Sequence, residues 1–158
     1  MTYKEKAIAL FESGANCAQA VFTAFGDLTG IEEKTALRLS SSFGGGLGRQ
    51  REVCGAVSGM CMVAGILYGY DDIKDEAAKA AHYRLIQELC DAFRERFETI
   101  ICRELLGEKK TAHIPDPSPR TEEYYRRRPC ARLVGTAAEI MEEYIAAHPI
   151  AAPEKDRL

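Results

Sequence analysis

An uncharged stretch near the middle of the chain constrains the fold more than any other feature. It runs from Val53 to Tyr70 as VCGAVSGMCMVAGILYGY and is followed by Asp71 and Asp72. A helix whose apolar side chains lie on every face must be surrounded by protein or lipid. The stretch is short for a membrane span, contains glycines, and has no second span or polybasic flank beside it. The sequence therefore predicts a buried central helix and no membrane insertion.

The composition favours helices throughout the chain. Alanine, leucine, glutamate and arginine are plentiful and tryptophan is absent, and 158 residues can bury a core without disulfides. We predict an all-α, single-domain bundle of about five to seven helices over residues 1–147, with a long loop at 108–129 and a flexible tail at 148–158. Gly55 and Gly59 stand one turn apart, which would let a neighbouring backbone approach the central helix closely.

Apolar periodicity and cap signals divide this bundle into individual helices. They predict helices over residues 3–12, from Asn16 to about Gly26, from about 31 to 42, over 53–70, from Asp71 or Asp72 to a break near Glu98, from there to Gly107, and from Pro129 onward. One further turn is expected at residues 121–125. The glycine-rich segment 44–48 is expected to pack closely beside the start of the central helix.

Charge and cysteine content limit the classes of function. The net charge is −3 with acidic and basic residues interspersed, so no overall field recruits nucleic acid or an anionic membrane. The first residues, MTYKEKAIAL, lack the features of a secretion signal, and we expect a cytoplasmic protein. In that compartment six cysteines indicate metal binding, catalysis or packing. The residues specify neither a redox partner nor an oligomeric state.

Four cysteines follow signals for helix starts: Cys17, Cys54, Cys102 and Cys130. A helix N-terminus carries partial positive charge and free N–H groups, which lower the pKa of a thiol placed there. Arginines at positions 49 and 51 precede one of these cysteines, and arginines at 126–128 precede another. Thiolates are the nucleophiles of disulfide exchange and also ligands of metals. The pattern therefore indicates thiol chemistry or a metal site.

The motifs around these cysteines resemble those of a known family. They are GANCAQAV at Cys17, CGAVSG at Cys54 after SFGGGLGR, ICRELLG at Cys102 and RPCARLV at Cys130. Over residues 12–143 the chain resembles a family of redox-active proteins named for its C-GCAxxG-C-C pattern. Val53 before the second cysteine and Gly55 after it change the motif to CGAxxG. The resemblance implies a cysteine-based redox role for the four matched cysteines.

Three functions are compatible with these residues. In the first, Cys17, Cys54, Cys102 and Cys130 cycle between thiols and disulfides or transfer electrons. In the second, the same four cysteines hold an iron–sulfur cluster or zinc, since four thiolates complete either site. In the third, the chain is a non-catalytic helical adaptor with cysteines in its core. The first two hypotheses require cysteines that are distant in sequence to converge in the fold.

The remaining two cysteines are interpreted as packing residues. Cys61 and Cys90 match no position of the family pattern, and free cysteines are often simply buried. Cys61 lies mid-helix among apolar residues, so we expect its pKa to be raised. Cys54 starts the same helix near Arg49 and Arg51, so we expect it to have a lowered pKa and to react first.

Overall fold

The structure, a computed structural model, describes residues 1–108 and 114–150, and these residues form helices without a named strand. The predicted all-α fold is confirmed. Among the described residues, six helices have eight or more residues, within the predicted range. The α-helices are α1 (Tyr3–Glu12), α2 (Cys17–Ala24), α3 (Gly26–Thr29), α4 (Glu33–Ser40), α5 (Gly44–Leu47), α6 (Gly55–Tyr68), α7 (Glu76–Phe97), α8 (Cys102–Leu105), α9 (Glu122–Arg127) and α10 (Cys130–Ala147).

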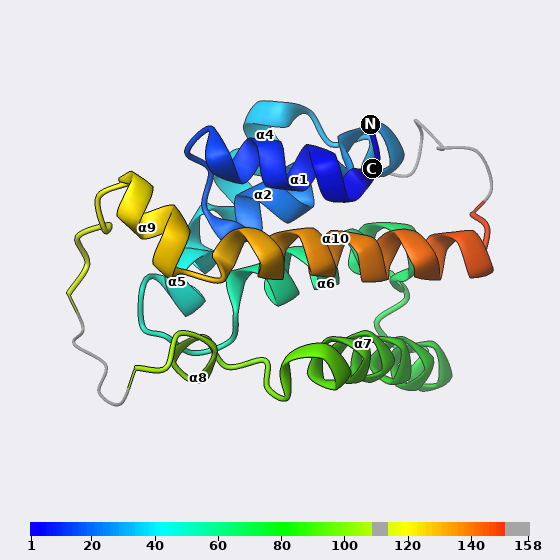
Figure 1. Ribbon diagram of the computed structural model, residues 1–158. Helices are drawn as coiled ribbons and strands as arrows, with labels where there is room; N and C mark the ends of the chain where they lie inside the picture. Colours follow the sequence, from blue (N-terminus) through cyan, green and yellow to red (C-terminus); the bar gives the residue numbers. More distant parts are fainter. Residues whose placement is uncertain (109–113, 151–158) are drawn as a thin grey trace.

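Helix α6 is the predicted central helix. None of its residues is exposed, and α2, α7 and α10 pack against it (Figure 1). The helix begins at Gly55 rather than Val53, because Cys54 has non-helical backbone angles, with φ of −51° and ψ of 129°, and is the N-cap. Val53 is 37 % exposed and forms an isolated antiparallel bridge with Ile101. The apolar surface of α6 is therefore satisfied by protein neighbours. Within the described residues, no helix combines the length and apolar character needed to cross a membrane.

Two glycines of α6 allow α2 to lie against it at close range, as predicted. A Cβ atom on Gly59 would lie 2.7 Å from the carbonyl oxygen of Ala18 and 3.0 Å from Cβ of Val21. A Cβ atom on Gly55 would lie 3.1 Å from Cβ of Cys17. The absence of side chains at these two positions thus brings the first turn of α2 onto the first turn of α6.

Local capping explains most of the helix boundaries. Asn16 forms a capping box with Gln19 at the start of α2, as the sequence predicted for its N-cap. Helix α7 begins later than predicted, because the side chain of Asp75, rather than Asp71 or Asp72, accepts the hydrogen bond from the N–H of Ala78. The predicted helix over about 31–42 is α4 followed by a 3₁₀ turn at Ser41–Phe43, and the short α3 was not predicted.

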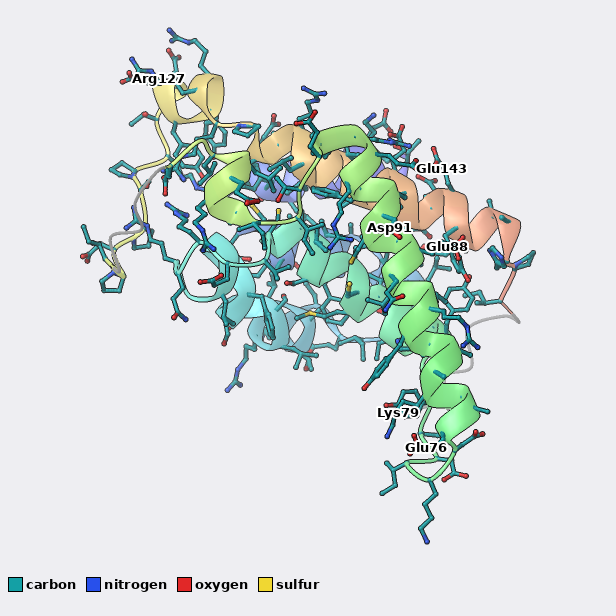
Figure 2. The ribbon with its side chains drawn as sticks, turned by 90° about the horizontal axis from the view of Figure 1, so that it is seen from below. Glu76, Lys79, Glu88, Asp91, Arg127 and Glu143 are labelled. Carbon is teal, nitrogen blue, oxygen red and sulfur yellow. The ribbon has the colours of Figure 1, made fainter. Side chains whose placement is uncertain are left out.

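Helix α7 ends at Phe97, as predicted, because Glu98 adopts a left-handed conformation with φ of 70°. Its apolar stripe is buried at Leu89 and Phe93, whereas Ala77 and Ala81 are exposed. Figure 2 shows why: the first turns of α7, marked by Glu76 and Lys79, extend away from the other helices.

The described part of the segment between α8 and α10 contains one short helix. Helix α9 corresponds to the predicted turn, and Thr121 caps it by accepting from the N–H of Tyr124. The predicted loop at 108–129 falls partly on residues 109–113, and the predicted tail at 148–158 largely on residues 151–158. Residues 109–113 and 151–158 lie outside the described residues.

Candidate functional site

All four family-matched cysteines stand at helix starts. Cys17, Cys102 and Cys130 are the first residues of α2, α8 and α10, and Cys54 is the N-cap of α6. Together they line one cavity of about 60 Å³, called here the thiol cavity. The structure therefore brings together the four residues that the sequence singled out. The lining of the cavity includes residues of α5, α8 and the first turn of α10, and these three elements lie at the same end of the bundle in Figure 1.

Cys102 reaches this cavity because its segment is tied to the chain before α6. Its N–H donates to the carbonyl of Glu52 at 2.6 Å, and the N–H of Cys54 donates to the carbonyl of Ile100 at 2.8 Å. Gly46 lies against the same place, since a Cβ atom on it would lie 2.7 Å from Cβ of Cys102. The glycine-rich segment thus packs beside the cysteines, as expected.

Residues 44–51 form an unusual loop in front of α6. Besides its glycines, Leu47, Arg49 and Arg51 have positive φ of 69°, 64° and 61°. Such conformations are unfavourable for residues with a Cβ atom and persist only where the surroundings enforce them. The loop leaves the Arg51 residue only 6 % exposed, with its side chain paired to Glu108. A buried guanidinium is therefore held next to the thiol cavity.

Cys17 and Cys130 form a hydrogen-bonded thiol pair. This hydrogen bond and burial raise the pKa of Cys17 well above its usual value. The same hydrogen bond lowers the pKa of Cys130 to about 7, assisted by the guanidinium groups of Arg128, Arg51 and Arg120 and opposed by burial. At neutral pH a larger share of Cys130 is therefore thiolate than of an ordinary cysteine, whose pKa of about 8.5 leaves it mostly protonated.

The prediction that Cys54 has a lowered pKa is wrong. Burial raises the pKa of Cys54 to about 12, although the backbone N–H groups of Ala56 and Val57 act in the opposite direction. The helix start does stabilise the thiolate, but Cys54 is only 3 % exposed. The cost of removing the thiolate from water therefore exceeds this stabilisation. The pKa of Cys102 is also raised, chiefly by burial, with Arg51 opposing. Within the thiol cavity, Cys130 is the most acidic thiol.

Cys61 and Cys90 form a second thiol pair outside the thiol cavity. Both belong to or pack against the hydrophobic core, in line with their interpretation as packing residues. A hydrogen bond between them and burial raise the pKa of Cys61, which confirms that prediction. The same hydrogen bond, with Arg94, lowers the pKa of Cys90 to about 7. The contact was not predicted, because the packing of α7 on α6 determines it and no spacing in the sequence reveals it.

The pKa differences predict selective alkylation of the reduced protein. When the pH is raised from about 6 to about 8, labelling of Cys130 and Cys90 should rise with a midpoint near 7, because only the thiolate reacts. Cys54 and Cys61 should stay largely unmodified. Brief alkylation followed by peptide mapping measures all four residues in one sample. Labelling of Cys54 before Cys130 would contradict the pKa order given above.

The arginines near the cavity divide into two groups. Arg51 and Arg128 line it, whereas Arg126 and Arg127 are exposed on α9 and have no part in its lining. Arg120 also lines the cavity. It comes from the long loop, and no motif in the sequence marks it. Its guanidinium lies over the ring of Phe11, 4.4 Å from the centroid, and donates to the carbonyls of Phe11 and Ala15 at 3.1 Å.

The metal-site hypothesis finds no support in this arrangement. Within residues 1–108 and 114–150, no group of three or more histidine, cysteine, aspartate or glutamate side chains is arranged to hold a metal ion. All six cysteines are free thiols.

Comparison with known proteins agrees with the cysteine pattern. Residues 15–144 match the model of a family described as "Putative redox-active protein (C_GCAxxG_C_C)". Comparison with curated proteins and with solved structures returns no significant match. The family match spans most of the chain and includes all four residues of the thiol cavity. The chain therefore belongs to the C_GCAxxG_C_C family.

Proposed function

We propose that the protein reduces small disulfides through thiol–disulfide exchange at the thiol cavity, starting from Cys130. The observation that carries the proposal is the cavity in which Cys130 and Cys17 lie together beside Arg51, Arg120 and Arg128. The contact with Cys17 and these guanidinium groups lower the pKa of Cys130, whereas that of Cys17 is raised. An attacking thiol works best when its pKa lies near the ambient pH. Convergence of four thiols on one cavity also favours this function over an adaptor with dispersed core cysteines.

The exchange proceeds in two steps. The thiolate of Cys130 attacks one sulfur of the substrate disulfide, forms a mixed disulfide and releases the other sulfur as a thiolate, which takes a proton from water. Cys17 then gives its proton to water and attacks Sγ of Cys130, which releases the second substrate thiolate, itself protonated by water, and leaves a Cys17–Cys130 disulfide. Two electrons pass from the cysteine pair to the substrate, which is reduced to two thiols. A mixed disulfide is the required intermediate of such exchange.

Burial limits the substrate to small molecules. Cys130 is 7 % exposed, and the cavity it lines has a volume of only about 60 Å³. The disulfide of a folded protein could not reach its sulfur without a rearrangement of the cavity wall. Cys54 and Cys102 form the rest of the thiol lining, and their raised pKa values keep them protonated while Cys130 reacts.

The products of a single turnover test this proposal. We expect reduced protein carrying Cys61→Ala and Cys90→Ala, which removes the second thiol pair, to release two coloured thiolates rapidly from a chromogenic aromatic disulfide. Mass spectrometry should then find a Cys17–Cys130 disulfide and no bound reagent. With Cys17→Ser added, one thiolate should be released and the reagent should stay attached to Cys130.

Two results would overturn the proposal. One is rapid release that leaves the reagent on Cys54 or Cys102, since that would place the first attack elsewhere. The other is stoichiometric iron or zinc in protein purified without oxygen, bound so that all four cavity cysteines resist alkylation. The second result would restore the metal-site hypothesis for the same residues.

A further inference from the structure

A second, larger pocket adjoins the thiol cavity and is lined by arginines. Its volume is about 390 Å³, and its lining includes Arg49, Arg51, Arg120 and Arg128, called here the arginine pocket. It shares Asn16, Gly45, Arg51, Arg120, Tyr124 and Arg128 with the thiol cavity. No aspartate or glutamate among the described residues belongs to its lining. A molecule in this pocket would therefore stand beside the thiols in a strongly positive environment.

Two of these guanidinium groups are held together by a neutral acceptor. Nη2 of Arg49 and Nη2 of Arg128 each donate to Oγ of Ser118 at 3.2 Å. Nη1 of Arg49 donates to the carbonyl of Ile114 at 2.7 Å. Each guanidinium has five N–H donors, so both keep donors free for a ligand. Two positive charges brought onto one hydroxyl repel each other, and an anion bound between them would relieve that repulsion.

Arg51 differs from the other three arginines of the pocket in having a carboxylate partner. Arg51 is paired with Glu108 at 3.2 Å. Within the part of the chain that the structure describes, none of the other three pocket arginines lies within ion-pair distance of a carboxylate. The guanidinium of Arg120 lies against the ring of Tyr124, 4.9 Å from its centroid, and that of Arg128 lies against the same ring at 5.0 Å. Rigidly placed guanidinium groups of this kind suit planar carboxylates and phosphates.

We infer that the arginine pocket binds a carboxylate or phosphate group of the substrate and thereby presents a small anionic disulfide to Cys130. This inference rests on the proposed function for the reaction, but the binding of an anion does not. An uncharged disulfide of the same size would lack this attraction, and a cationic one would be repelled. The charge of the molecule, rather than its shape alone, then selects the substrate.

The first test measures binding without redox chemistry. The variant Cys17→Ser/Cys130→Ser is titrated with inorganic phosphate in a calorimeter at low ionic strength. We expect saturable binding at one site, weakened about tenfold by adding Arg49→Gln, which removes one charge-assisted donor. Arg127→Gln is the matched control, because Arg127 pairs with Glu123 on α9, points away from the bundle in Figure 2 and does not line the pocket. Phosphate binding that is absent, or equal in both arginine variants, overturns the site.

The second test measures the charge preference of the reaction. Three aliphatic disulfides are compared, those of mercaptopropionate, mercaptoethanol and mercaptoethylamine, which are anionic, neutral and cationic. We expect the anionic disulfide to react about tenfold faster with Cys130 than the neutral one, and the cationic one to be slowest. Arg49→Gln should reduce that ratio, and so should added salt. Equal rates for all three would overturn the substrate class while leaving the proposed exchange intact. Phosphate binding without any disulfide reduction would leave the anion site and refute the exchange.

Discussion

Cys130→Ser is expected to slow exchange with a small disulfide by at least about a hundredfold at neutral pH. The variant removes the cavity thiol with the lowest pKa, which is the one most ionised at pH 7. Cys54, with a pKa of about 12, has on the order of one thiolate in a hundred thousand molecules at that pH. Its greater intrinsic nucleophilicity recovers only part of that difference. Stopped-flow absorbance in the Cys61→Ala/Cys90→Ala background measures the rate.

The variant Cys17→Ser distinguishes the roles of Cys17 and Cys130 in the exchange. A serine hydroxyl can still donate to Cys130, so the first attack should continue at a rate within about tenfold of the parent, while the second step is lost. Circular dichroism of each variant shows whether the fold is retained. If Cys130→Ser reacted as fast as the parent, the nucleophile would have to be sought among Cys17, Cys54 and Cys102.

Gly59→Ala and Gly65→Ala should change stability in opposite directions although both lie in α6. A Cβ atom on Gly59 would lie 2.7 Å from a backbone carbonyl of α2, so α2 and α6 must separate, whereas nothing lies within 4 Å of a Cβ atom on Gly65. We expect Gly59→Ala to lower the free energy of unfolding by about 2 kcal/mol. Gly65→Ala should raise it by up to about 1 kcal/mol, because alanine favours the helix and restricts the unfolded chain.

Urea unfolding of the reduced proteins, followed by circular dichroism, gives both free energies. The two variants share the residue change, the helix and the gain in helix propensity, so their difference isolates the contact between α6 and α2. A stabilised Gly59→Ala variant would mean that α2 does not approach α6 as closely as described. Because that contact also brings Cys17 toward Cys54, the unstable variant should show weaker selectivity for Cys130 in alkylation.

The sequence predicted the parts of this structure that depend on neighbouring residues. The N-cap at Asn16, the end of α7 near Glu98 and the burial of α6 all follow from short-range patterns, and these predictions are confirmed. The placement of cysteines at helix starts was predicted for the same reason. The small residues Gly55 and Gly59 further indicated which face of α6 a neighbour would approach.

Properties that depend on the folded surroundings were predicted less well. The helix start lowers the pKa of Cys54, as predicted, but burial raises it by more. Burial is determined by the tertiary structure. The low pKa of Cys130 depends on a hydrogen bond with Cys17 and on guanidinium groups that include Arg51, and both of these residues are distant in sequence from Cys130. The contact of Cys61 with Cys90 likewise depends on how α7 crosses α6. A residue's helix position can thus be predicted from sequence where its ionisation cannot.

The distribution of the cavity cysteines over α2, α6, α8 and α10 ties thiol acidity to the integrity of the whole chain. In an unfolded chain Cys130 has neither Cys17 nor a set of guanidinium groups beside it, and its thiol returns to ordinary acidity. No fragment that begins after Cys17 or ends before Cys130 contains the pair. A chain cut short before α10 therefore lacks the acidic thiol of the cavity, and Cys130 becomes acidic only when α10 docks against α2.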